Sequence, residues 1–179
     1  MSIKELVAGG VITLVIGGTA YTVSQADVAK NFADDTGLTT QEAEQYVNGV
    51  TEEDLVSYDV LGTSYVADGQ QLIDSANKID CINYEYEWAA SVLACEDGKA
   101  HLLKTGGDEI LLGEAFIKLN TNAASRQDIT STIQLLDTAN ENYRHEIFAK
   151  VIGEASVDET MKNNSYNKAL LKAALDSNN

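Results

Sequence analysis

The sequence contains no proline, and it has few basic residues: 12 lysines and arginines stand against 28 aspartates and glutamates. Because proline interrupts helices, its absence removes a common helix stop and favours long helices. The net charge of −16 argues against nucleic acid or anionic lipid as a partner, since both require lysine and arginine at the contact. A solvated acidic surface is the simplest interpretation, and an acidic cation-binding module is the alternative.

Cysteine is also scarce, with Cys81 and Cys95 as the two residues of this type. They do not have CxxC spacing and no histidine pair accompanies them, so metal ligation is not indicated. In a domain outside the cytoplasm, the simplest use of two cysteines is a single disulfide. We therefore predict a Cys81–Cys95 bond.

The common catalytic and nucleotide-binding motifs are missing. The chain has no GxSxG, HExxH or GxGxxG sequence and no Walker phosphate loop. His101 and His145 are the two histidines, and each falls in a regular element, where a structural role is the usual outcome. No calcium loop with its closing glutamate can be drawn around the acidic runs 34–35 and 52–54. The sequence therefore predicts a non-catalytic protein without a cofactor or a metal.

One long stretch, residues 6–23, carries no charge. As a helix it has nearly the length of the hydrocarbon core of a bilayer, which favours a transmembrane anchor over residues 1–23. A cleaved signal peptide ending at Ser24-Gln25-Ala26 and a buried helix of a soluble domain are the alternatives. Glu5 spoils the positive region that a signal peptide requires, so we favour an uncleaved anchor.

The anchor carries small residues at helical spacing, and we predict that they pack against another helix. Gly10, Thr13, Gly17 and Ala20 fall near one face, where small side chains let two helices approach closely within a membrane. This stripe predicts protein partners through the anchor, in a homo-oligomer or a larger assembly. Lys4 precedes the apolar run and aspartates follow it, which predicts that residues 24–179 lie outside the cytoplasm, in the periplasm or the extracellular space.

Residues 24–80 read as helices. The segment 24–36 has helical spacing and is ended by Gly37, and a capping box from Thr39 to Glu42 opens a short helix that stops at 48–49. A third helix begins near residue 51 and continues to about Lys78. Its core-facing positions recur at steps of three and four: Leu55, Tyr58, Gly62, Tyr65, Gly69, Leu72, Ala76 and Ile79.

From Cys81 the pattern changes to alternation, which is typical of strands. Residues 82–88 alternate aromatic and polar side chains, and Asp97-Gly98 lies between two apolar runs as in a β-hairpin. A second turn at 105–108 and a possible strand at 115–119 complete an antiparallel meander. A long helix capped at Ser125 then continues to Gly153, and a last helix begins at a capping box from Ser156 to Glu159. The predicted fold class is α+β: a transmembrane helix, then several helices packed on a small antiparallel meander.

Two short motifs resemble signatures of penicillin-binding proteins and serine β-lactamases. Ser75-Ala76-Asn77-Lys78 reads SxxK, and Lys104-Thr105-Gly106 reads KTG. The resemblance implies a small envelope serine hydrolase in which Ser75 is the nucleophile and Lys78 assists its deprotonation. The order departs from the family pattern, because the SxN motif at Ser165-Tyr166-Asn167 follows both others instead of lying between them.

The N-terminus shows a second resemblance: Glu5, directly before the apolar run, resembles the glutamate near the mature start of type IV pilins.

The function that these patterns favour is structural. We predict a membrane-anchored, non-catalytic subunit of an envelope complex or surface filament, which acts by packing against protein partners. The serine hydrolase that uses Ser75 and the acidic cation-binding module are the alternatives.

Overall fold

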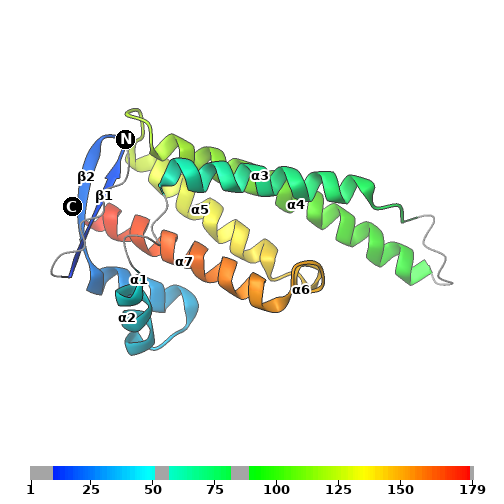
Figure 1. Ribbon diagram of the computed structural model, residues 1–179, viewed down its shortest axis with the longest axis horizontal. Coiled ribbons are helices and arrows are strands. Elements are labelled where there is room, and N and C mark those ends of the chain that lie inside the picture. The colour runs from blue at the N-terminus through cyan, green and yellow to red at the C-terminus, as the bar shows by residue number, and fades with distance from the viewer. Residues whose placement is uncertain (1–9, 51–56, 82–88, 178–179) are drawn as a thin grey trace.

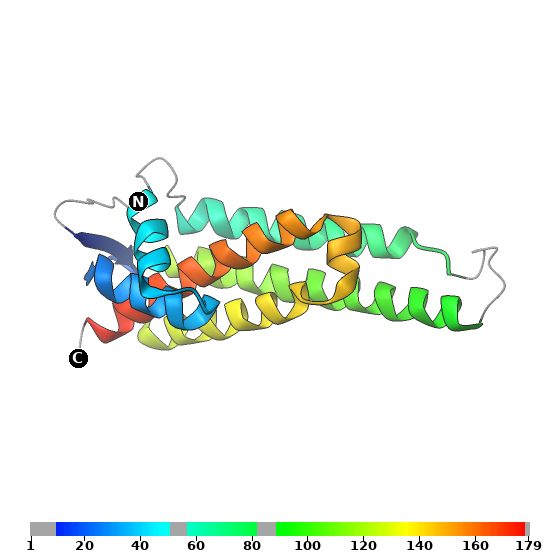
Figure 2. The same ribbon diagram turned by 90° about the horizontal axis from the view of Figure 1, so that it is seen from below.

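The computed structural model describes residues 10–50, 57–81 and 89–177. In these residues the chain forms a β-hairpin and seven helices, and the longest helices run side by side along the long axis of the molecule (Figure 1). The hairpin and two short helices lie at one end. At the other end, two antiparallel helices extend beyond the rest (Figure 2).

The described part of the charge-free stretch, residues 10–23, forms the hairpin and is not a helix. Strand β1 (Val11–Ile16) pairs antiparallel with β2 (Thr19–Ser24), with Val15 opposite Ala20 and Ile16 opposite Thr19. Gly17 and Gly18 form the two-residue turn with φ of 59° and 76°. Positive φ at both central residues is typical of the hairpin turn whose twist matches that of the flanking strands.

The predicted transmembrane helix is therefore wrong. Side chains alternate along β1, where Ile12, Leu14 and Ile16 are 1–2% exposed, and five of the six residues of β1 are β-branched, which favours strands. No helix in the described part of the chain is long and apolar enough to cross a membrane. This finding also contradicts the prediction of a single-pass membrane protein whose C-terminal domain lies outside the cytoplasm.

The predicted helix-packing stripe has no helix to lie on. Gly10 precedes β1, Thr13 lies in β1, Gly17 is in the turn and Ala20 is in β2. The constraint on Gly17 is different from the one expected: a Cβ there would meet the backbone oxygen of Ala124 at 2.8 Å. Its amide also donates to the carbonyl of Leu119 at 2.9 Å, so the turn is held against the helical bundle.

The first two helices follow the sequence signals. Helix α1 (Gln25–Thr36) is capped by Ser24 and ends at Gly37 with φ of 73°, and α2 (Thr40–Gly49) begins with the predicted capping box of Thr39 and Glu42. The residues of β1 lie in the same hydrophobic cluster as Phe32 of α1 and residues of the later helices. The hairpin and these helices therefore contribute to one core.

The predicted meander is a single helix. Helix α4 (Ala89–Leu119) spans both predicted turns, and residues 82–88 lie outside the described part of the chain. Helix α3 (Tyr58–Lys78) follows the predicted seam and lies antiparallel to α4 (Figure 1). The glycines that indicated turns have another role in the helix: a Cβ on Gly98 would meet Ile147 at 2.6 Å.

Two glycine pairs bring the backbones of α3 and α4 into contact. A Cβ on Gly62 would lie 2.5 Å from the carbonyl oxygen of Gly113, and a Cβ on Gly69 would lie 2.5 Å from that of Gly106. The reciprocal Cβ positions on Gly106 and Gly113 would be equally close, at 2.6 Å and 2.5 Å. Real Cβ atoms do not approach an oxygen so closely, so all four positions require glycine in this arrangement.

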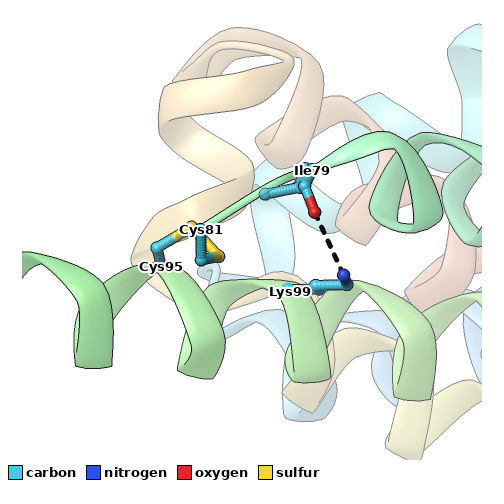
Figure 3. Close-up of a disulfide and its surroundings, with 4 residues drawn as sticks. All are labelled: Ile79, Cys81, Cys95 and Lys99. Carbon is cyan, nitrogen blue, oxygen red and sulfur yellow. Dashed lines mark hydrogen bonds between the residues drawn. A yellow bond between two sulfur atoms is a disulfide. The ribbon is translucent and has the colours of Figure 1, made fainter. Parts of the chain in front are cut away.

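The predicted disulfide is confirmed. Cys81 and Cys95 are bonded, with Cα atoms 5.7 Å apart, and they link the end of α3 to α4 (Figure 3). Beside this bond, the ammonium group of Lys99 donates a hydrogen bond to the carbonyl of Ile79 at 3.0 Å (Figure 3). A disulfide of this kind persists in oxidising compartments.

The C-terminal helices differ from the prediction in their boundaries. Helix α5 (Arg126–Tyr143) is capped by Ser125 as predicted, but it ends ten residues before Gly153. A short helix α6 (Glu146–Val151) follows, and the His145 ring nitrogen caps it by accepting from the amide of Ile147. Helix α7 (Glu154–Asp176) begins directly after Gly153, so Ser156 lies inside it and does not cap it.

The glycine contact predicts opposite effects for two neighbouring substitutions. Gly106→Ala should lower the free energy of unfolding by about 2 kcal/mol or more, because its Cβ must displace the α3 backbone. Gly107→Ala should raise it by about 1 kcal/mol, because nothing lies within 4 Å of the new methyl group and alanine favours helix. Urea denaturation of both variants measures the difference, and equal effects would show that the helices are not in backbone contact.

Candidate functional site

A pocket of about 300 Å³ opens between α3, α4 and the segment from the end of α5 to α7. Its floor is buried and its rim is exposed. Leu102, Glu109, Tyr143 and Phe148 are at most 8% exposed, whereas Asp68 and Ser75 are exposed. The residues that line it are Asp68, Gln71, Leu72, Ser75, Leu102, Glu109, Tyr143, Phe148, Ile152 and Thr160.

Glu109 is the unusual residue of this pocket. It is 1% exposed, although charged side chains are rarely so deeply buried without a partner. One carboxyl oxygen, Oε1, accepts a hydrogen bond from the hydroxyl of Tyr143. The other, Oε2, is buried and has no hydrogen-bond partner among the described residues.

The pKa of Glu109 is raised from 4.5 to about 7. Burial is the main cause, because it disfavours the charged form. The hydrogen bond from Tyr143 acts in the opposite direction, and the negative charge of Asp68 raises the pKa further. Glu109 therefore changes its charge near neutral pH.

The close contact between Gly69 of α3 and Gly106 of α4 explains why Glu109 is buried. Glu109 lies one helical turn after Thr105 and Gly106, and its Cβ would be only 3.1 Å from a Cβ on Gly69 of α3. The carboxyl group is thus held against the neighbouring helix, where water has little access. Thr105 is also fully buried, and its hydroxyl has no hydrogen-bond partner among the described residues.

Beside the pocket, a buried polar network joins α3, α5 and α7. The hydroxyl of Tyr65 donates to the side-chain oxygen of Asn164. The Asn164 amide donates to Asn140 at 2.9 Å, and the Asn140 amide donates to the hydroxyl of Ser165 at 3.1 Å. Burial raises the pKa values of Tyr65 and Tyr143, and the charge of Glu109 raises both further. Both tyrosines therefore stay protonated and act as hydrogen-bond donors.

The nearest lysine on α4 is already paired. Lys104 contacts Asp108 at 2.8 Å and donates to the side chain of Asn142 at 2.7 Å. Burial tends to raise the pKa of Asp108, but hydrogen bonds from Lys104 and Asn142 outweigh it and lower this pKa. The charge of Lys104 is thus balanced by Asp108.

The structure does not assemble the residues of the predicted serine hydrolase. Ser75 lies at the exposed rim of the pocket, and Lys78 is exposed at the last turn of α3. Ser165 of the SxN motif belongs to the buried network. His101 and His145 stack with ring centroids 4.0 Å apart, and His101 contacts the carbonyl of Asn142.

The structure does not show a cation site at the acidic residues that it describes in the runs 34–35 and 52–54. Asp35 forms an ion pair with the buried Lys168, which also pairs with Asp137. Residues 52–54 fall within 51–56, outside the described part of the chain. Among the described residues, no group of three or more histidines, cysteines, aspartates or glutamates is arranged to hold a metal ion.

Comparisons with known proteins do not identify a relative: no family model, no curated protein and no solved structure matches this chain. A functional hypothesis for the pocket therefore rests on the residues that line it.

Sequence reasoning missed Glu109 because it placed this residue in a strand, paired with Lys104 across the predicted turn at 105–108. A helical reading of the same segment contains a signal. Leu102, Thr105, Glu109, Leu112 and Phe116 recur at steps of three and four, so a single carboxylate lies within an apolar stripe. An acidic residue in such a stripe is a candidate for a functional group.

The raised pKa of Glu109 predicts how stability depends on pH. The unfolded chain loses this proton near pH 4.5 and the folded chain near pH 7, so stability should fall across this window and then level off. The contribution of Glu109 to this fall is about 3 kcal/mol. Glu109→Gln should remove it and be more stable than the wild type at higher pH.

Urea denaturation at a series of pH values measures this contribution. Glu114→Gln, which removes an exposed carboxylate from the same helix, is the control and should keep the wild-type profile. An unchanged profile in Glu109→Gln would show that Glu109 is not buried as described.

Proposed function

We propose that this protein is a non-catalytic binding protein that holds a small molecule in the Glu109 pocket. The observation that carries the proposal is that Glu109 lines the pocket and that its buried Oε2 atom has no hydrogen-bond partner among the described residues. A buried polar atom without a partner costs about 1–3 kcal/mol. A ligand that hydrogen-bonds this oxygen would offset that cost.

The shape and lining of the pocket support this function. Its volume of about 300 Å³ is at the lower end of the range for small-molecule sites. Leu72, Leu102, Phe148 and Ile152 supply apolar surface, and Glu109 and Tyr143 supply polar groups at one place. Apolar walls with a few convergent polar groups are typical of binding pockets. The polar network beside the pocket fixes the helices that form it.

Blocking the mouth of the pocket tests the proposal. Ser75→Trp places a large side chain at the rim, whereas Asn77→Trp places the same side chain at another exposed position of α3 that does not line the pocket. We expect at least one of benzylamine, benzyl alcohol and benzoate to bind wild type and Asn77→Trp. Binding to Ser75→Trp should be at least about tenfold weaker.

Amide chemical-shift changes in ¹⁵N-labelled protein measure these affinities and show where each probe binds. Equal affinity in the two tryptophan variants, or no binding of any probe to the wild type, would contradict the proposed function.

An assembly role is a second candidate, and the shape of the molecule favours it. Helices α3 and α4 form an arm that extends beyond the other helices (Figures 1 and 2) and is cross-linked by the disulfide. Val60 on α3 and Leu111 on α4 are 57% and 52% exposed. A protruding pair of helices, with exposed apolar residues elsewhere on the same two helices, fits a structural subunit that acts by packing, as a homo-oligomer or in a larger assembly.

The molar mass in solution tests this second role. Light scattering of the purified protein over a range of concentrations should give a multiple of the 19.3 kDa chain mass. Val60→Asp and Leu111→Asp should shift the mass toward the monomer, because a charge at an apolar contact is costly to bury. A monomer at all concentrations would remove the support for self-assembly.

A further inference from the structure

The pocket is lined by two acidic residues. Glu109 lies at its buried floor and Asp68 at its exposed mouth, and both carboxyl groups line it. Among the lining residues that the structure describes there is no lysine, arginine or histidine, and Lys104 on the same helix as Glu109 is paired with Asp108. The electrostatic potential in the pocket therefore favours a positively charged ligand.

We propose that the ligand of this pocket is an organic ammonium compound, an amine with an apolar body, whose ammonium group donates a hydrogen bond to Oε2 of Glu109. This inference rests on the proposed binding function and specifies its ligand class. The ammonium group supplies both the missing hydrogen-bond donor and the opposite charge. A charge-assisted hydrogen bond of this kind is roughly twice as strong as one between neutral groups.

The walls of the pocket fit the apolar body of such a ligand. Leu102 and Phe148 are buried at its floor beside Glu109. The rings of Tyr143 and Phe148 lie with centroids 4.9 Å apart and planes inclined by 55°. Aromatic rings attract organic cations through their negative faces. The aromatic walls therefore recognise the same ligand class as the carboxylates.

Two other ligand classes fit less well. A divalent metal ion such as calcium takes about six to eight oxygen ligands. The pocket supplies two carboxylates, of which Glu109 is buried at the floor and Asp68 is exposed at the mouth, so the ligand set is too small for calcium. A carboxylic acid or phosphate would bring negative charge to these two groups, and the repulsion would weaken its binding.

Binding of an amine should depend on pH through Glu109. Among the described residues, the titratable groups that face Glu109 are Asp68 and Tyr65 on α3 and Tyr143 on α5. The described lining residues of α6, α7 and the segment between them carry no titratable group. The ammonium group binds the carboxylate form, so protonation of Glu109 competes with it. With a pKa near 7, affinity should fall as the pH decreases through neutrality.

Calorimetric titration with benzylamine, benzyl alcohol and benzoate tests the ligand class, because the three probes share one ring and differ in charge. We expect benzylamine to bind at least about tenfold more tightly than benzyl alcohol at about pH 8, and benzoate more weakly still. At about pH 5.5 the affinity for benzylamine should fall by about thirtyfold, since only a few per cent of Glu109 is then ionised. The affinity for benzyl alcohol should change little.

Two substitutions separate the carboxylates from a general effect of net charge. Glu109→Gln should abolish both the preference for benzylamine and its pH dependence while benzyl alcohol still binds. Asp68→Asn, at the exposed mouth, should weaken benzylamine severalfold without affecting folding. Glu114→Gln, an exposed change on α4 outside the pocket, should leave the affinity for benzylamine unchanged.

The outcomes distinguish the ligand class from the binding function. If benzyl alcohol or benzoate binds the pocket as tightly as benzylamine, the amine proposal is wrong and the binding function stands. If Glu114→Gln weakens benzylamine as much as Glu109→Gln does, the preference is a general effect of acidity and the amine proposal is also wrong. If no probe binds, both proposals fail.

Discussion

The close contact between α3 and α4 is the constraint on which the rest of the structure depends. Four glycines at heptad spacing, two on each helix, let the backbones touch where any Cβ would clash. Glycine is unfavourable in a helix by about 1 kcal/mol relative to alanine, and the close packing of α3 against α4 offsets this cost. The contact between Gly69 and Gly106 also brings Glu109 against α3 and excludes water from its carboxyl group.

The pocket follows from this arrangement. A carboxylate held in a narrow interhelical space loses hydration, and one hydrogen bond from Tyr143 does not replace it. The network from Tyr65 to Ser165 pairs the buried polar groups of α3, α5 and α7 beside the pocket, whereas one oxygen of Glu109 has no partner among the described residues. Proteins keep such costly groups mostly at functional sites, which is why the binding function and the preference for a cation are both assigned to this residue.

Different contacts hold the helices together at the two ends of the molecule. At one end the β-hairpin buries its alternating side chains in the main core and is tied to α4 through Gly17. At the other end the disulfide and Lys99 hold the end of α3 against α4. The pocket lies between these restraints, and α6, a short helix held by His145 and by Phe148 in the smaller hydrophobic cluster, forms part of its wall. A preorganised wall lowers the entropy cost of binding a ligand.

Local sequence signals were enough to predict the caps at Thr39 and Ser125, the seam of α3 and the Cys81–Cys95 bond. Each depends on residues near one another in the chain or on the reactivity of one residue type. The sequence by itself did not decide the states of residues 6–23 and 89–119, because charge-free and glycine-rich segments fit more than one element. Tertiary packing decided both: the hairpin found a core to cover, and glycines that favour turns in isolation allowed two helix backbones to meet. The position of Glu109 followed from that contact, since burial is a property of the packed helices and not of the segment alone.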